Sequence, residues 1–114
     1  ETGILMRRGL IAVGGRVGEF AAAGMIAGTV AALGGFGPRY GAGLKRGTLV
    51  AAGGDPVPTP GFHFSCEYRP AFLGRFLGYL REVGFEPAMH VALGTTRCYR
   101  GDVLTGGKGE LLAI

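Results

Sequence analysis

The stretch that decides the fold is MIAGTVAALG at residues 25–34, which corresponds to MRRGLIAVGG at residues 6–15 and to LKRGTLVAAG at residues 44–53. Each copy lies 19 residues after the previous one, and three copies run from Gly3 to about Asp55. The offset aligns two columns of glycine and one column of large apolar residues: Gly9, Gly28 and Gly47; Gly15, Gly34 and Gly53; and Met6, Met25 and Leu44. A fixed period near 20 with glycine columns is typical of a solenoid.

Each copy contains a four-residue apolar run bounded by glycine, at 10–13, 29–32 and 48–51. Four residues suit a strand and are too few for the helices of helical repeats. Strands in identical columns would stack at the spacing of about 4.8 Å between neighbouring strands. We therefore expect an all-β fold, a parallel β-helix with coils of about 19 residues and glycine at the corners, where a positive φ is needed.

The composition supports a folded, glycine-rich chain. Of 114 residues, 24 are glycine, and no collagen-like G-X-Y period is present. The chain is 47% hydrophobic and has a mean hydropathy of +0.31, which is too apolar for a charged disordered segment. The length fits a single domain. Residues 20–38 carry no charge but consist mostly of Ala and Gly, so we expect no membrane segment.

From residue 56 onward the repeat ends and the chain becomes aromatic. Pro56, Pro58 and Pro60 interrupt strand pairing, and residues 62–68 are predicted to form a strand. A helix over about 70–83 is predicted by Pro70 at its start, by Gly84 at its end and by an apolar stripe of Phe72, Leu73, Phe76, Leu77 and Leu80. We expect residues 1–55 to form three β-helix coils, and residues 56–114 to cap them within the same domain. Further copies before Gly3, or a partner chain, would cover the other end.

Basic residues suggest one candidate contact surface. The net charge is +4 and the pI is near 9.5. Arg7 and Arg8 occupy the same repeat columns as Lys45 and Arg46 and lie two copies away from them. These four residues could contact carboxylates of a partner chain or of an acidic ligand, or could form an ordinary solvated surface. Nucleic acid is not expected, because aromatic residues do not alternate with the cations.

No catalytic or metal-binding residue is predicted. A zinc site can be written from His63, Cys66, His90 and Cys98, but neither pair has the close spacing that makes such a site specific. A Cys–His catalytic pair would need an electropositive pocket, and nothing in the sequence marks one. We expect both cysteines to be reduced thiols of a cytoplasmic protein.

Residues 24–30 and 41–50 resemble the glycine-repeat domain of three protein families. These are the C-type subunit of formylmethanofuran dehydrogenase, the C-type subunit of the related formyltransferase/hydrolase complex, and the C-terminal domain of the glutamate synthase large subunit. The resemblance implies a right-handed parallel β-helix. The ending at residues 101–111 and the aromatic helix resemble the two C-type subunits more than glutamate synthase, and residues 62–85 favour the formyltransferase/hydrolase complex.

The resemblance to the C-type subunits implies a non-catalytic structural subunit of a cytoplasmic one-carbon complex. Such a complex handles formyl groups on a methanofuran-type cofactor and, in the formyltransferase/hydrolase version, on tetrahydromethanopterin. The partners would be the other subunits, which would carry catalysis, and this chain would bind no cofactor itself. Methanofuran-type cofactors bear glutamate-rich tails, which Arg8 and Arg46 could contact. The alternatives are a glutamate-synthase-type spacer domain of a larger enzyme and a free-standing scaffold or binding protein.

Overall fold

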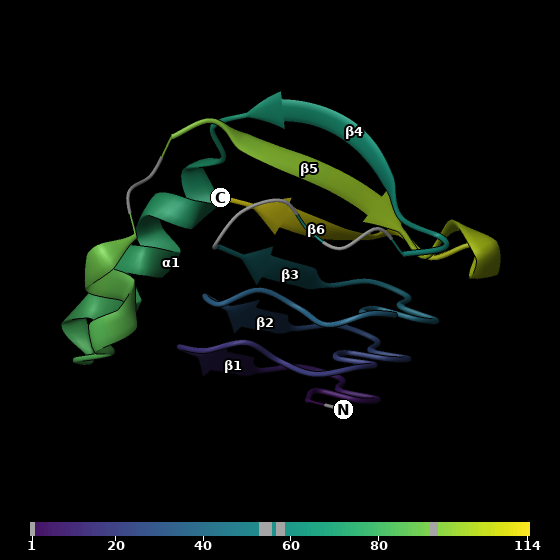
Figure 1. The fold of residues 1–114 in the computed structure, drawn as a ribbon, viewed down its shortest axis with the longest axis horizontal. Coiled ribbons are helices and arrows are strands. Elements are labelled where there is room, and N and C mark those ends of the chain that lie inside the picture. The colour runs from purple at the N-terminus through teal and green to yellow at the C-terminus, as the bar shows by residue number, and fades with distance from the viewer. Residues whose placement is uncertain (1, 53–55, 57–58, 92–93) are drawn as a thin grey trace.

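The computed structural model describes residues 2–52, 56, 59–91 and 94–114. The described residues form six strands in one sheet, in the spatial order β1-β2-β3-β6-β5-β4 (Figure 1). In chain order the strands are β1 (Leu10–Val13), β2 (Thr29–Ala32), β3 (Thr48–Ala51), β4 (His63–Tyr68), β5 (Thr96–Gly101) and β6 (Gly109–Ala113). The helices are α1 (Ala71–Glu82) and the short 3-10 helices η1 (Glu86–His90) and η2 (Val103–Thr105).

The three sequence copies supply three neighbouring parallel strands. Leu10 pairs with Thr29, and Thr29 pairs with Thr48, so that each residue faces its equivalent 19 residues away. The next strand in the sheet is β6, which is also parallel and sets Glu110 opposite Thr48. The glycine repeat therefore fixes the register of half of the sheet, and the end of the chain adds a fourth parallel strand to it.

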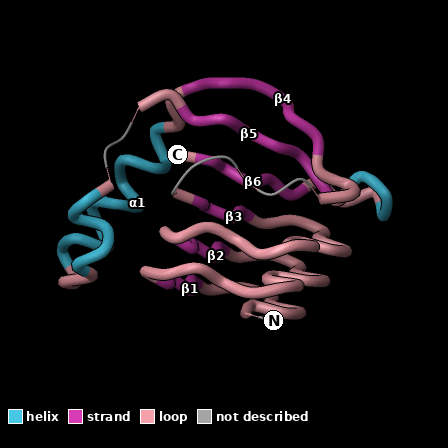
Figure 2. Tube along the Cα trace, in the orientation of Figure 1, coloured by secondary structure: helices cyan, strands magenta, loops and turns pink. Residues whose placement is uncertain are grey.

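The expected all-β parallel β-helix is wrong, because the strands form a mixed sheet. β5 runs antiparallel to β6, and β4 runs antiparallel to β5 (Figure 2). Each copy offers only one β-favouring run, and the rest of it forms turns in which Phe20, Ala22 and Arg39 have positive φ values. Outside the strands, the described residues contain a single isolated bridge, between Val17 and Phe36. The second half of the chain consequently extends the same sheet.

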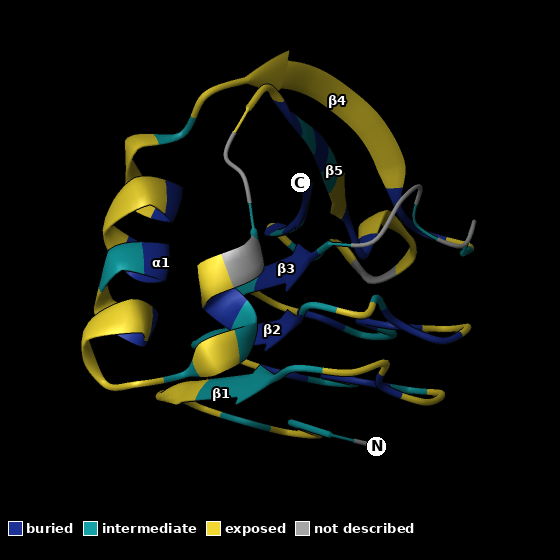
Figure 3. Cartoon of the chain, turned by 60° about the vertical axis from the view of Figure 1, so that its left-hand side comes forward, coloured by how far each residue is buried: buried dark blue, intermediate teal, exposed yellow. Residues whose placement is uncertain are grey.

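Apolar residues cover both faces of the sheet. On one face the turns of the copies enclose a core that includes the fully buried Met25, Leu44, Leu49 and Leu111. On the other face α1 packs its buried residues against Ala31, Val50 and Leu112, with Leu73, Phe76, Leu77 and Leu80 as the helical contribution. Figure 3 shows the buried side of α1 turned toward the strands and its exposed side turned outward. α1 lies within the range 70–83 in which the sequence predicts a helix.

A buried carboxylate joins the loop after β5 to the third copy. Asp102 is 5% exposed, and its side chain accepts hydrogen bonds from the N–H of Gly43 at 3.0 Å and from the N–H of Leu104 at 2.9 Å. Because the Gly43 bond spans 59 residues, Asp102 holds the β5–β6 end of the sheet against the repeat.

Candidate functional site

The glycine columns of the repeat lie where successive copies touch. Gly9, Gly28 and Gly47 have φ values of 106°, 109° and 116°, which L side chains rarely adopt. A Cβ atom added to Gly28 would lie 2.9 Å from the carbonyl oxygen of Gly9, and one added to Gly34 would lie 2.5 Å from the carbonyl carbon of Gly15. Within the third column, Met25 and Leu44 are fully buried and Met6 is half-buried. Gly53 lies outside the described residues.

The structure brings the four predicted basic residues to one side of the repeat. Arg7, Arg8, Lys45 and Arg46 are all exposed. Two backbone hydrogen bonds set the segments side by side: Ile26 N–H donates to the carbonyl of Met6 at 2.7 Å, and Lys45 N–H donates to that of Met25 at 2.9 Å. The first and third copies are thus separated by one intervening copy, or about 10 Å at the usual strand spacing.

A fifth cation, Lys108, extends this surface and was missed by the sequence analysis. Its N–H donates to the carbonyl of Lys45 at 2.7 Å, and its side chain is exposed. The available signal was the similarity of GELLA at residues 109–113 to GTLVA at residues 47–51, which places Lys108 in the column of Arg46. We call Arg7, Arg8, Lys45, Arg46 and Lys108 the basic row.

The two cysteines face each other across β4 and β5 but lie in different environments. Cys66 is exposed and Cys98 is fully buried, and both are free thiols. Burial, with a smaller effect of the Glu110 carboxylate, raises the pKa of Cys98 to about 11. Its Sγ lies 3.8 Å from Glu110 Oε2. Within the described residues, no three His, Cys, Asp or Glu side chains gather to hold a metal ion, and the side chain of His90 is outside that description.

The outer strand β4 offers a second candidate surface. It is the last strand of the sheet, and all six of its residues are exposed (Figure 3). Phe64 and Tyr68 are 55% and 38% exposed, although the Phe64 ring packs edge-on at 5.6 Å from that of Tyr99. An edge strand presents unpaired N–H and C=O groups on which another chain can pair. The sequence predicted this strand but gave no sign that it would lie at the edge.

The comparisons with known proteins give one informative match. A scan against models of protein families finds no match, and a search of curated proteins finds none. Within the described residues, no helix is long and apolar enough to cross a membrane. Among solved structures, the chain is similar to a chain of the formyltransferase/hydrolase complex from Methylorubrum extorquens, solved in complex with methylofuran. The TM-score is 0.85 at 38% identity, and the match covers 99% of this chain and 42% of that chain, so this sequence spans less than half of its neighbour's length.

Proposed function

We propose that the chain is a non-catalytic structural subunit of the C type, or part of one, in a formyltransferase/hydrolase complex that handles formyl groups on a methanofuran-type cofactor. The proposal rests on one observation, the likeness over 99% of the chain to a component of such a complex. Sequence identity of 38% over that length exceeds what a shared fold alone requires. The resemblance of residues 24–30 and 41–50 to the C-type subunits points to the same kind of complex.

Two surfaces support a role in assembly. The open edge of β4 carries exposed aromatic side chains, and such residues are enriched in protein interfaces. The basic row places five exposed cations along one side of the repeat, in two groups with one copy between them, and positive charge gathered on one side favours association with an acidic partner surface. Both surfaces suit contact with other proteins of a complex.

The buried thiol of Cys98 is not suited to act as a nucleophile. Nucleophilic cysteines need a lowered pKa, because the thiolate is the reacting form. The environment of Cys98 acts in the opposite direction, since burial and the Glu110 carboxylate both raise the pKa of this thiol. Cys98 is therefore a packing residue of the core between the sheet and α1.

The direct test is to purify the tagged protein from the cells that produce it, and to identify the co-purifying subunits. We expect formyltransferase and hydrolase subunits in fixed stoichiometry, and formyl transfer by the assembly but not by this chain alone. Formyl transfer or hydrolysis by the isolated chain would overturn the non-catalytic role. Stable association with glutamate synthase domains instead would overturn the assignment to this complex.

A charge-reversal experiment tests the basic row separately. The double variant Arg8→Glu, Arg46→Glu is compared with Arg75→Glu, which reverses one exposed charge on α1. We expect the double variant to bind the complex at least about tenfold more weakly, with a reduced salt dependence, since rim charges act through electrostatic attraction. Arg75→Glu should bind as the wild type does. Unchanged affinity and salt dependence in the double variant would remove the basic row from the interface.

A further inference from the structure

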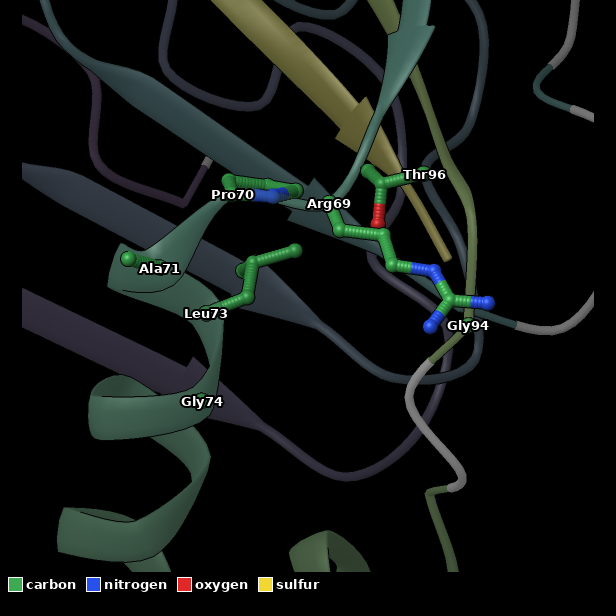
Figure 4. Close-up of a pocket in the computed structure, with 7 residues that line it drawn as sticks. All are labelled: Arg69, Pro70, Ala71, Leu73, Gly74, Gly94 and Thr96. Carbon is green, nitrogen blue, oxygen red and sulfur yellow. The ribbon is translucent and has the colours of Figure 1, made fainter.

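A pocket at the junction of α1 and β5 has no place in the proposed assembly role. It has a volume of about 220 Å³ and is lined by residues from both elements, among them Arg69, Pro70, Ala71, Leu73, Gly94 and Thr96 (Figure 4). The register of the sheet forms this junction. Thr96 begins β5 opposite Tyr68, the last residue of β4, and α1 begins only three residues after Tyr68.

Thr96 carries a hydroxyl group without a partner. The residue is fully buried, and its Oγ1 has no hydrogen-bond partner among the described residues. A buried polar group left unpaired destabilises the fold, so proteins seldom keep one without a use. Figure 4 shows this hydroxyl turned toward the Arg69 side chain, beside the first residues of α1.

The start of α1 adds further donors and positive potential. The N–H groups of Ala71 and Phe72 have no acceptor within the helix, whereas that of Leu73 donates to the carbonyl of Pro70 at 3.2 Å. α1 has no side-chain cap and no acidic residue in its first turn. The helix dipole makes this end positive, and Arg69, which precedes the helix and is exposed, adds a full positive charge on the Gly94 side of the pocket (Figure 4). A cation at this end of a helix is unfavourable by itself, whereas an anion bound between the two would offset both charges.

We propose that this pocket binds an oxyanion, either a carboxylate or a phosphate group, through the Thr96 hydroxyl, the N-terminal N–H groups of α1 and Arg69. Among the described residues that line the pocket, side chains supply donors and apolar walls and no carboxylate, which favours a negatively charged, acceptor-only ligand. The site is separate from the basic row and from the glycine columns, because neither lines it, and it adjoins Tyr68 at the end of β4.

The experiment titrates the isotope-labelled full chain with sodium phosphate and, separately, with sodium acetate at constant ionic strength, followed by amide NMR. We expect saturable shifts of the Ala71, Phe72 and Thr96 amides for at least one anion. Saturation by phosphate alone identifies a phosphate site, and saturation by acetate alone identifies a carboxylate site. The absence of saturable shifts with both anions would overturn the proposal, as would shifts no larger than those caused by sodium chloride.

Variants then connect binding to the named groups. Thr96→Val removes the hydroxyl group at nearly constant volume and should weaken binding about tenfold, whereas Thr96→Ser keeps the hydroxyl and should bind as the wild type does. Arg69→Gln should weaken binding by a similar factor, with Arg75→Gln, an exposed position within α1, as its control. Unfolding in urea checks that each variant is folded. If Thr96→Val does not fold, the comparison of Arg69→Gln with Arg75→Gln still tests the site. Equal affinity in Thr96→Val, Arg69→Gln and the wild type would place the anion elsewhere and overturn the proposal.

Discussion

The glycine column at Gly28 gives a quantitative test of how the repeats pack. Gly9 and Gly28 have nearly the same φ, 106° and 109°, but differ in their surroundings. A Cβ added to Gly9 meets no described atom within 4 Å. A Cβ added to Gly28 lies 2.9 Å from the Gly9 carbonyl oxygen and 2.5 Å from Cε of Met6. Alanine at Gly9 therefore measures backbone strain, and alanine at Gly28 measures the same strain plus the contact between copies.

The expected costs follow from these two terms. An L residue with positive φ costs about 1–2 kcal/mol, part of which is offset because alanine reduces the entropy of the unfolded chain by about 0.4–1 kcal/mol. Overpacking against a neighbour adds about 1–3 kcal/mol. We expect Gly9→Ala to cost about 1 kcal/mol, and Gly28→Ala to cost about 1–3 kcal/mol more than that. Gly47→Ala should cost at least as much as Gly28→Ala, since it approaches the Gly28 carbonyl oxygen to 2.9 Å and the fully buried Met25 to 2.6 Å.

The assay is equilibrium unfolding in urea, followed by circular dichroism, for the wild type and the three alanine variants. Comparable m-values are required, so that the midpoints report stability alone. The double variant Met6→Ala, Gly28→Ala separates the side-chain contact from the backbone contact, because it removes the Met6 methyl group and leaves the Gly9 carbonyl in place. If Gly9→Ala and Gly28→Ala destabilise the chain equally, within about 0.5 kcal/mol, the argument from contact between copies is refuted.

Three further predictions concern the core and the buried acids. The pKa of Cys98 is about 11 in the folded chain and 9.0 when unperturbed. This thiol should therefore leave the free energy of unfolding unchanged below pH 9. Above pH 9 it should lower that free energy by at most about 1.4 kcal/mol per pH unit. Cys98→Ala should remove this slope between pH 9 and 10. Tyr40 contributes only above this interval, because burial raises its pKa from 10.0 to about 12. An unchanged slope would contradict the assignment of the slope to Cys98. Asp102→Ala should cost about 2–4 kcal/mol in urea unfolding, since it leaves the Gly43 and Leu104 N–H groups without their carboxylate acceptor, and a loss below 1 kcal/mol would contradict this role. Leu77→Ala, at a fully buried position on α1, should lower the free energy of unfolding by about 2–5 kcal/mol. Leu104→Ala, at a position 71% exposed, should lower it by less than about 0.5 kcal/mol. Similar losses for the two variants would show that α1 does not pack as described.

The parts of the fold that were predictable are those with a period in the sequence. A repeat of 19 residues sets equivalent columns side by side, which is the register observed for Ile11, Val30 and Leu49 in β1, β2 and β3. The helix was predictable because the stripe that includes Leu73 and Leu77 recurs at helical spacing between a proline and a glycine. Both predictions use only residues that are close in sequence or related by one fixed offset.

The mixed sheet was not predictable in this way, because it depends on one pairing outside the period. β6 joins β3 with Glu110 opposite Thr48, and their side chains share a hydrogen bond of 3.3 Å across 62 residues. Once β6 occupies that place, the hairpin through η2 requires β5 to be antiparallel, and β4 follows β5 at the edge. The fold class was predicted wrongly because the pairing of β6 with β3 lies outside the 19-residue period. The five residues GELLA at 109–113 are too few to be identified as a further copy from that period alone.

The same register decides how the two proposed sites relate to each other. Lys108 precedes Gly109 of β6, which pairs with Gly101, the last residue of β5. Thr96 is the first residue of β5, next to the pair of Arg97 with Ala113 at the far end of β6. The basic row and the oxyanion pocket therefore lie at opposite ends of the same strands. Reversing charge in the basic row should weaken assembly and leave anion binding intact, and Thr96→Val should do the reverse, so that either proposal can fail without the other.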